Sequence, residues 1–482
     1  MVDSLGAETF HKGWAMGELP TFLSSGERAR LFPVLADTSR EGRATSIFLA
    51  CLANVREFAD ELLSSVGRGI GITSKVSAYT EICFNNSTGK IKFRPDGLIV
   101  VETGRSNWSA LIESKIGNAE LSRDQIESYL KLARENGINA VITISNQHAT
   151  SSADHPVKID GKLLGKAALY HWSWMDILTT ADLLLTNGRV QDREQKIMLN
   201  EFRRFLSHDS TGVKGFDRMP AEWPKLIADL GTGAQITAQS EILTSVVRAW
   251  HLELRDLSLI LSRQIGVPVS VKLSKQEARH PEERLKNDCA AFCNSHCLSA
   301  LLMIPEAAVD IEITVDVRSR TLAAGAKLLA PKDRKSTSAR LNWLLRQISE
   351  VPAQDAYVRV HWPYRGYTQY PLSELRQTLE RVTTEHPDST PMALEVLTVK
   401  RTERRFTQVS NFVEDIERLV PNFYGSVGSK LKAWQPPAPG IRPERNESAD
   451  VSTEGISEDA EEAVAEFSDP PEDEPSKKKF WF

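Results

Sequence analysis

Three short apolar runs joined by turn residues restrict the possible folds of this chain more than any other feature. They are TEICF at Thr80 to Phe84, GLIVV within KIKFRPDGLIVV, and SALI within WSALIESKI. A polar Asn-Asn-Ser-Thr-Gly stretch separates the first two runs, and a second turn at residues 104 to 107 precedes the third. Short apolar segments bounded by such turns predict an antiparallel three-strand meander.

Helical patterns lie on both sides of the meander. Within Ala44 to Val66, apolar residues recur every three or four positions, which predicts an amphipathic helix. A second helix is expected from about Ala119 to Asn136, where Gly137 is a usual C-terminal stop. NAVITIS at Asn139 to Ser145 is typical of a buried strand. The predicted order is therefore helix, three strands, helix, strand.

An aspartate and a Glu-Ser-Lys sequence lie inside the predicted meander. Side chains alternate faces along a strand, so Glu113 and Lys115 share one face while Ser114 points to the other. Two carboxylates from adjacent strands, Asp96 and Glu113, can bind Mg²⁺, which prefers oxygen ligands and keeps several waters. A metal so placed lowers the pKa of a bound water, and Lys115 can orient that water. These residues are the minimum set for phosphodiester hydrolysis.

With Pro95-Asp96, sixteen intervening residues and Glu113-Ser114-Lys115, the chain resembles the PD-(D/E)XK nuclease superfamily. The following helix carries Gln125 and Tyr129, similar to the Q-x-x-x-Y feature of the RecB-like branch. The resemblance covers about residues 44 to 150 and implies a restriction-endonuclease-like core. It also implies that Asp96 and Glu113 bind Mg²⁺ or Mn²⁺ and that Lys115 acts on the attacking water. Gln125 is then expected to act in the catalytic site, supporting it or contacting DNA, and Tyr129 to support the site.

A third metal ligand could come from the first strand of the meander. Glu81 is the expected residue, although a surface position at a strand edge explains it equally well. Glu57 and Glu61, one helical turn apart on the preceding helix, are weaker rivals for the same role, because a solvated helix face accounts for them. On the D...ExK pattern alone, Asp96, Glu113 and Lys115 could also belong to an ordinary solvated strand pair.

The length of 482 residues indicates two or three domains. We expect an N-terminal segment, irregular or briefly helical, over residues 1 to 43, and the nuclease-like domain over 44 to 207. A Gly- and Pro-rich linker is expected at 208 to 235. It leads to an α+β domain of unknown role at 236 to 433, and a disordered acidic tail follows at 434 to 482.

The formal net charge of -5 averages two unlike regions. From Glu444 to the C-terminus, 13 acidic and 4 basic residues give -9, which leaves +4 for residues 1 to 443. A mildly basic body is compatible with DNA as a partner. The tail ends in three lysines followed by Phe480, Trp481 and Phe482. We expect a motif that docks in a protein partner, because exposing three aromatic residues is costly, although a random apolar end of a flexible tail is the alternative.

Three further clusters resemble chemical sites, but each also has a simpler structural interpretation. Cys289, Cys293, His296 and Cys297 have helical spacing, but ligands on one short helix cannot surround zinc, so core packing is expected. Asp310, Glu312 and Asp316 fit the wet side of an amphipathic strand. The basic, aromatic segments beginning at His361 and Lys400 could contact nucleic acid or be solvated surface.

The N-terminus lacks a secretory signal pattern, and no apolar run approaches the roughly 20 residues of a membrane span. Five cysteines, an odd number, agree with a reducing compartment, so a cytoplasmic protein is expected. Our first functional hypothesis is a metal-dependent deoxyribonuclease acting in defence against foreign DNA or in repair. The alternative is a non-catalytic nucleic-acid-binding or scaffold protein that retains the nuclease fold.

Overall fold

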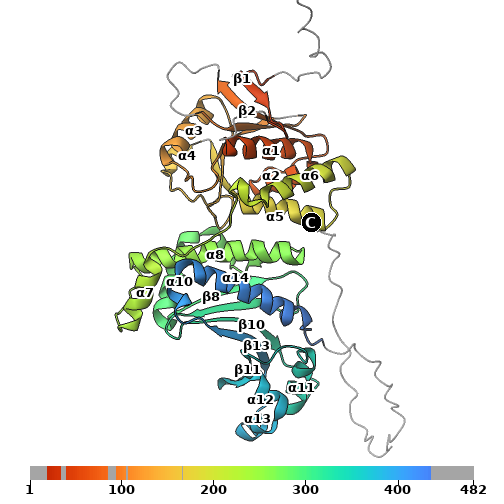
Figure 1. Ribbon diagram of the computed structural model, residues 1–482, viewed down its shortest axis with the longest axis vertical. Coiled ribbons are helices and arrows are strands. Elements are labelled where there is room, and N and C mark those ends of the chain that lie inside the picture. Colours follow the sequence, from red (N-terminus) through yellow and green to blue (C-terminus); the bar gives the residue numbers. More distant parts are fainter. Residues whose placement is uncertain (1–18, 34–38, 85–93, 105–106, 166, 436–482) are drawn as a thin grey trace, which may run out of the picture. The chain divides into compact units, whose positions relative to one another are not determined.

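The computed structural model describes residues 19–33, 39–84, 94–104, 107–165 and 167–435. The expected acidic tail with its aromatic end, and the Asn-Asn-Ser-Thr-Gly stretch, lie outside these residues. Up to Gln435 the chain forms one compact unit that contains a six-stranded and a seven-stranded sheet (Figure 1). The protein is thus a mixed α/β protein. Within the described residues, no helix combines the length and apolar character needed to cross a membrane.

The first sheet has its strands in sequence order, and the predicted meander is its centre. The first four strands pair antiparallel, whereas the fourth, fifth and sixth pair parallel. A parallel pair needs a crossover, and helix α3 (Arg123–Glu135) supplies it between the fourth and fifth strands. The strands are β1 (Leu23–Arg28), β2 (Lys75–Phe84), β3 (Gly97–Glu102), β4 (Asn107–Ser114), β5 (Ala140–Ser145) and β6 (Ala168–Ser173).

Each face of this sheet has its own apolar core. Helix α3 packs on one face together with Leu98 and Leu111, while Ile99 and Ile112 point to the other. That second face carries an aromatic cluster in which the Phe48 ring meets those of Trp172, Trp174, Phe58 and Phe202. The helices that build it are α1 (Arg40–Asn54), α2 (Arg56–Ser65), α5 (Trp174–Thr186) and α6 (Arg193–Leu206).

Two expectations for the N-terminal part of the chain were wrong. The single helix expected over residues 44 to 66 is two helices, because Val55 has an extended backbone and Asn54 Nδ2 donates to the Ala50 carbonyl at 2.7 Å. The break lets Phe48 and Phe58 both contact Phe202. The segment up to residue 43, expected to be irregular or helical, contains strand β1. Only Leu23 of this edge strand is buried, so it shows no alternating apolar pattern.

The second sheet is antiparallel throughout, in the order β12-β11-β13-β10-β9-β8-β7. Its core lies against the long helix α8 (Glu241–Ile265) and helix α14 (Val409–Ser426). Its strands are β7 (Ser270–Val271), β8 (Cys297–Met303), β9 (Ile311–Asp316), β10 (Thr321–Leu329), β11 (Ala356–Trp362), β12 (Gly366–Pro371) and β13 (Ala393–Arg401). The remaining helices of four or more residues are α4 (Gly161–Leu164), α7 (Glu222–Gly231), α9 (Lys275–Arg279), α10 (Pro281–Ser295), α11 (Thr337–Gln347), α12 (Leu372–Gln377) and α13 (Glu380–Glu385).

The segment expected to be a linker is largely part of the second core. Helix α7 lies within residues 208 to 235, and Trp223 on it is fully buried. The indole Nε1 of Trp223 donates to the carbonyl of Phe406 at 2.7 Å, and its ring packs against Phe412. Because burying a tryptophan removes a large apolar surface from water, this helix is part of the second core rather than a connection.

The other clusters behave largely as the simpler interpretations predict. Cys289 is buried in the second core and Cys293 packs against it, but α10 ends at Ser295, so His296 and Cys297 lie beyond the helix. Along β9, residues alternate between buried apolar and partly exposed polar ones, as expected for an amphipathic strand. The segment at His361 forms the β11–β12 hairpin. The imidazole of His361 pairs with Glu395 at 2.8 Å, and Lys400 pairs with Asp415 at 3.0 Å.

Candidate active site

The pairing of β3 with β4 brings Asp96 next to Glu113. Gly97 pairs with Ile112, so Asp96, one residue earlier, is adjacent to Glu113 on the antiparallel neighbour. Cross-strand neighbours project from the same face of a sheet, which here is the face covered by α3. A glycine is needed beside the aspartate, because a Cβ at Gly97 would lie 2.5 Å from Leu49 Cδ1 and 3.0 Å from the Tyr79 carbonyl oxygen.

Ser114, the middle residue of the Glu-Ser-Lys sequence, fixes the orientation of Asp96. Its backbone N–H donates to Asp96 Oδ2 at 2.8 Å, and its hydroxyl lies 3.4 Å from the same oxygen. The hydroxyl of Ser114 also contacts that of Thr45 on α1, on the opposite face from α3. The alternation expected from the sequence, with Ser114 pointing away from Glu113, therefore holds.

Lys115 lies just past the end of β4, and both its backbone N–H and its backbone carbonyl are hydrogen-bonded. Its N–H donates to the Ile144 carbonyl at 2.7 Å, and its carbonyl accepts from Trp174 Nε1 at 2.9 Å. The amine donates to Glu113 Oε1 at 2.6 Å and to Glu41 Oε1 at 3.0 Å. One cation thus bridges a carboxylate from the sheet and one from the first turn of α1.

Burial sets the protonation of this group. It raises the pKa of Asp96 to about 7, and the nearby Glu113 carboxylate adds to the effect. Burial also raises the pKa of Glu113, against the opposing contact with Lys115. For Lys115, burial disfavours the charged amine, but the hydrogen bonds to Glu113 and Glu41 outweigh it and raise the pKa. The Oε2 atom of Glu113 is buried and accepts no hydrogen bond.

Gln125 and Tyr129 face this group from α3. The Tyr129 hydroxyl donates to the Arg94 carbonyl at 2.9 Å, and the ring is almost fully buried. Burial and then the charge of Glu113 raise the pKa of Tyr129, whereas Gln125 acts on the same hydroxyl in the opposite direction. Tyr129 therefore lies beside the Glu113 carboxylate, and Gln125 lies beside the Tyr129 hydroxyl.

Glu81, the expected third metal ligand, is not gathered into this group. Its side chain is 58% exposed and pairs with Arg94 at 3.1 Å, and its backbone lies in the left-handed region with φ 54°. Its rival Glu61 pairs with Arg189 at 2.8 Å. The charges that act on Asp96 are instead those of Glu113, Lys115 and Glu41.

Glu41 is the residue of this charged group that sequence reasoning missed. The helix was expected to begin at Ala44, which left Glu41 in the preceding segment. The structure starts α1 at Arg40 and places Glu41 in its first turn. A glutamate just before an apolar helical pattern is a usual helix-start feature, so this signal was available.

No group of three or more histidine, cysteine, aspartate or glutamate side chains in the described chain is arranged to hold a metal ion. Two carboxylates still fit Mg²⁺, which commonly takes one or two from the protein and completes its shell with water and phosphate. The free Oε2 of Glu113 and the raised pKa of Asp96 both indicate unbalanced negative charge that a cation would neutralise. The residues present therefore fit a Mg²⁺ or Mn²⁺ ion.

A cavity of about 410 Å³ borders Asp96. Arg28, Arg30 and Arg94 line it together with Glu81. Arg30 pairs with Glu27 at 3.4 Å, and both side chains are 61% exposed. Exposed ion pairs of this kind contribute little, so the Arg30 guanidinium can exchange partners, whereas that of Arg94 also donates to the Ile82 carbonyl at 3.1 Å.

Comparison of the chain with known protein families, with curated protein sequences and with solved structures gave no significant match.

Proposed function

We propose that this protein is a metal-dependent nuclease that hydrolyses phosphodiester bonds, with Asp96, Glu113 and Lys115 at its centre. The observation that carries the proposal is the meeting of Asp96 and Glu113 across β3 and β4, with the Lys115 amine 2.6 Å from Glu113. The resemblance to PD-(D/E)XK nucleases in these residues supports it. So does the surrounding order of helix, meander, helix and parallel strand, which is that of a restriction-endonuclease-like core.

Asp96 and Glu113 would hold the ion, which supplies Lewis-acid polarisation of the phosphoryl group and a more acidic bound water. Lys115 stays charged at neutral pH, because Glu113 and Glu41 raise its pKa. It therefore acts as a hydrogen-bond donor that orients the attacking water and stabilises developing negative charge, not as a base. Ser114 keeps Asp96 aimed at the site through the 2.8 Å bond from its N–H.

The arginine-lined cavity beside Asp96 supports a nucleic-acid substrate. Guanidinium groups bind phosphate oxygens through two parallel hydrogen bonds, which suits a phosphodiester backbone. Arg28 and Arg94 line the cavity from β1 and from the turn before β3. In this proposal they hold the phosphates next to the one that is cleaved.

The test is cleavage of plasmid DNA, linear DNA, single-stranded DNA and RNA by purified protein, with and without Mg²⁺ or Mn²⁺. We expect metal-dependent cleavage that falls by at least about 10²-fold in Asp96→Asn and Lys115→Ala, the range for losing one stabilising group. Lys131→Ala, a change of an exposed lysine on α3, is the matched control and should leave the rate unchanged. Binding without cleavage of any substrate would instead favour a non-catalytic nucleic-acid-binding protein.

A further inference from the structure

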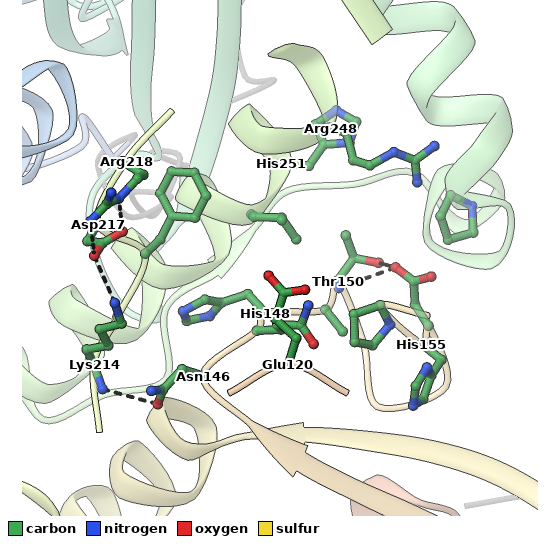
Figure 2. Close-up of a pocket in the computed structure, with 18 of the residues that line it drawn as sticks. Glu120, Asn146, His148, Thr150, His155, Lys214, Asp217, Arg218, Arg248 and His251 are labelled. Atoms are coloured by element: carbon green, nitrogen blue, oxygen red, sulfur yellow. Dashed lines mark hydrogen bonds and ion pairs between the residues drawn. The ribbon is translucent and has the colours of Figure 1, made fainter. Parts of the chain in front are cut away.

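A second cavity, of about 720 Å³, opens at the edge of the first sheet where β4 and β5 end. Residues 117–120 follow β4 and residues 146–150 follow β5, and both stretches line it (Figure 2). The opposite wall comes from residues 214–218, α8 and the start of α10. The carboxyl ends of parallel strands are where ligands bind in α/β sheets. Lys115, at the end of β4, places the candidate active site at this same edge.

We propose that this cavity binds a nucleoside phosphate, either as a free nucleotide or as one nucleotide of a single strand. The inference deepens the proposed nuclease function by naming what the chain recognises beside its cleavage site. Nucleotide binding is nevertheless measurable without any cleavage, so this proposal and the proposed nuclease function can be refuted separately.

His148 is the first observation that points to a ligand. It lines the cavity and is only 3% exposed, yet neither ring nitrogen has a hydrogen-bond partner. The nearest acidic oxygen, Asp256 Oδ2, is 3.9 Å away and accepts the Phe216 N–H instead. Buried polar groups in native proteins are nearly always paired, so an unpaired imidazole on a cavity wall calls for a partner inside the cavity.

Two acceptors that line the cavity with His148 define the partner further. The side-chain Oε1 of Gln147 is buried without a donor. Glu120 is exposed, also lines the cavity (Figure 2), and forms no ion pair with any described residue. Carboxylate and amide oxygens can only accept, so the ligand edge that meets them must carry N–H groups. A simple anion would be repelled by Glu120, whereas the amino-bearing edge of a nucleobase satisfies this set.

The rim of the cavity carries two corners with excess positive charge. Lys158 and Arg248 share the single carboxylate of Glu282, at 2.9 and 3.5 Å. In the other corner, Lys214 and Arg218 share Asp217, at 3.1 and 3.0 Å. These ion pairs are largely exposed and therefore weak, so a phosphate can take the place of the shared carboxylate.

Phe216, whose side chain is partly buried against the second core, is the phenylalanine among the residues that line the cavity. Its N–H donates to Asp256 Oδ2 at 2.6 Å, which fixes the backbone there. Gly215 allows this contact, because a Cβ at that position would overlap the same oxygen. The lining residues thus include an aromatic side chain, unpaired acceptors and two cationic corners, which match the base, the base edge and the phosphate of one nucleotide. The volume lies within the usual range of ligand pockets.

The test measures binding by the full-length chain in EDTA, so that no metal-dependent cleavage occurs. Calorimetry uses the 5′-monophosphates of adenosine, guanosine, cytidine and uridine, and anisotropy uses a labelled single-stranded oligonucleotide. We expect Glu120→Gln and Arg248→Ala each to weaken binding of the preferred nucleotide by at least about tenfold, because each removes a charge-assisted hydrogen bond. Both residues are at the rim or exposed, so the fold is kept. Glu135→Gln, the same change at an exposed glutamate of α3, should bind like the wild type.

The two sources give different results. Tight binding of free nucleotides, with no gain for the oligonucleotide, identifies a free nucleotide as the ligand. Binding of the oligonucleotide alone, weakened in both variants, identifies a nucleotide within a strand. The proposal is overturned if neither probe binds below about 1 mM, if both variants bind like the wild type, or if inorganic phosphate binds as tightly as the nucleotides. Nucleotide binding by a protein that cleaves nothing would uphold this cavity while refuting the proposed nuclease function.

Discussion

Replacing Asp96 with Asn should make the metal-free protein more stable at alkaline pH, even though it removes a proposed metal ligand. Burial and Glu113 raise the pKa of Asp96 from 3.8 to about 7. A carboxyl group with a raised pKa binds its proton more tightly in the folded state. Its ionisation therefore costs stability, and the cost is absent below about pH 4, grows as pH rises and is complete above about pH 7.

The size of the effect follows from the shift. A change of about 3 pKa units corresponds to about 4 kcal/mol at 1.36 kcal/mol per unit, which is the ceiling for an isolated group. Asp96 shares its environment with Glu113 and Lys115, so we expect Asp96→Asn to gain about 1–3 kcal/mol at pH 8. The asparagine Oδ1 can still accept the Ser114 N–H bond, so the geometry is kept.

The assay is urea denaturation in EDTA at pH 4, 6 and 8, with the exposed-loop change Asp333→Asn as control. The stabilisation should be largest at pH 8 and vanish at pH 4, while the control stays within about 0.5 kcal/mol of the wild type. Mg²⁺ should stabilise the wild type and not Asp96→Asn, since only the folded wild type binds the ion. An Asp96→Asn protein that is equally or less stable than the wild type at pH 8 would refute the charge-burial argument.

Three further predictions concern the framework around the site. Gly97→Ala should cost about 1–3 kcal/mol by overpacking against Leu49, whereas Gly104→Ala, with open space at its Cβ, should be nearly neutral; equal urea midpoints would contradict the tight approach. Trp223→Ala should destabilise the second core by about 3–5 kcal/mol, and the exposed change Lys225→Ala on the same helix should not; if both are silent, α7 is a linker after all. Burial lowers the pKa of His155 to about 4 and of His171 to about 3. As pH falls below 6.5, each of these histidines should therefore lower the free energy of unfolding of the protein by up to about 1.4 kcal/mol per pH unit. The free energy of unfolding of the Asp96→Asn protein between pH 7 and 4 tests this, because that protein lacks the opposing contribution of Asp96. His155→Gln should reduce the slope of this free energy against pH, and an unchanged slope would count against the prediction.

The meander and the placement of its site residues could be predicted because both depend on local pattern. Apolar runs bounded by turn residues specify the antiparallel strands, and the two-residue period of a strand puts Glu113 and Lys115 on one side. A shift of one residue in the register would turn the apolar side chains to the wrong face of the sheet. The register of β3 and β4, and with it the pairing of Asp96 with Glu113, is therefore fixed. These are contacts between neighbours in a hairpin, for which sequence distance and spatial distance agree.

The elements that were missed are held by contacts with distant parts of the chain. Strand β1 has one buried residue and exists because β2 offers it an edge. Helix α7 is short and follows Gly- and Pro-rich sequence, and its Trp223 finds its partner at Phe406. Helix α14 contains Pro421, which normally ends a helix, and it continues through that residue because Phe423 and Val420 are buried in the second core.

The burial of the site argues against one of the two interpretations left open by its sequence, the ordinary solvated strand pair. A solvated strand pair would leave Glu113 and Lys115 in water, but their side chains are only 2% and 15% exposed. Three carboxylates, from Asp96, Glu113 and Glu41, then lie near one amine, which donates hydrogen bonds to Glu113 and Glu41. The chain alone relieves this excess by holding a proton at Asp96 near neutral pH, and a divalent cation relieves it more completely. If Asp96 binds the proposed ion, binding must release that proton, so Mg²⁺ affinity should rise about tenfold per pH unit below pH 7 and level off above it. Calorimetry across pH 5.5 to 8 measures this, and a pH-independent affinity would show that Asp96 is not a ligand.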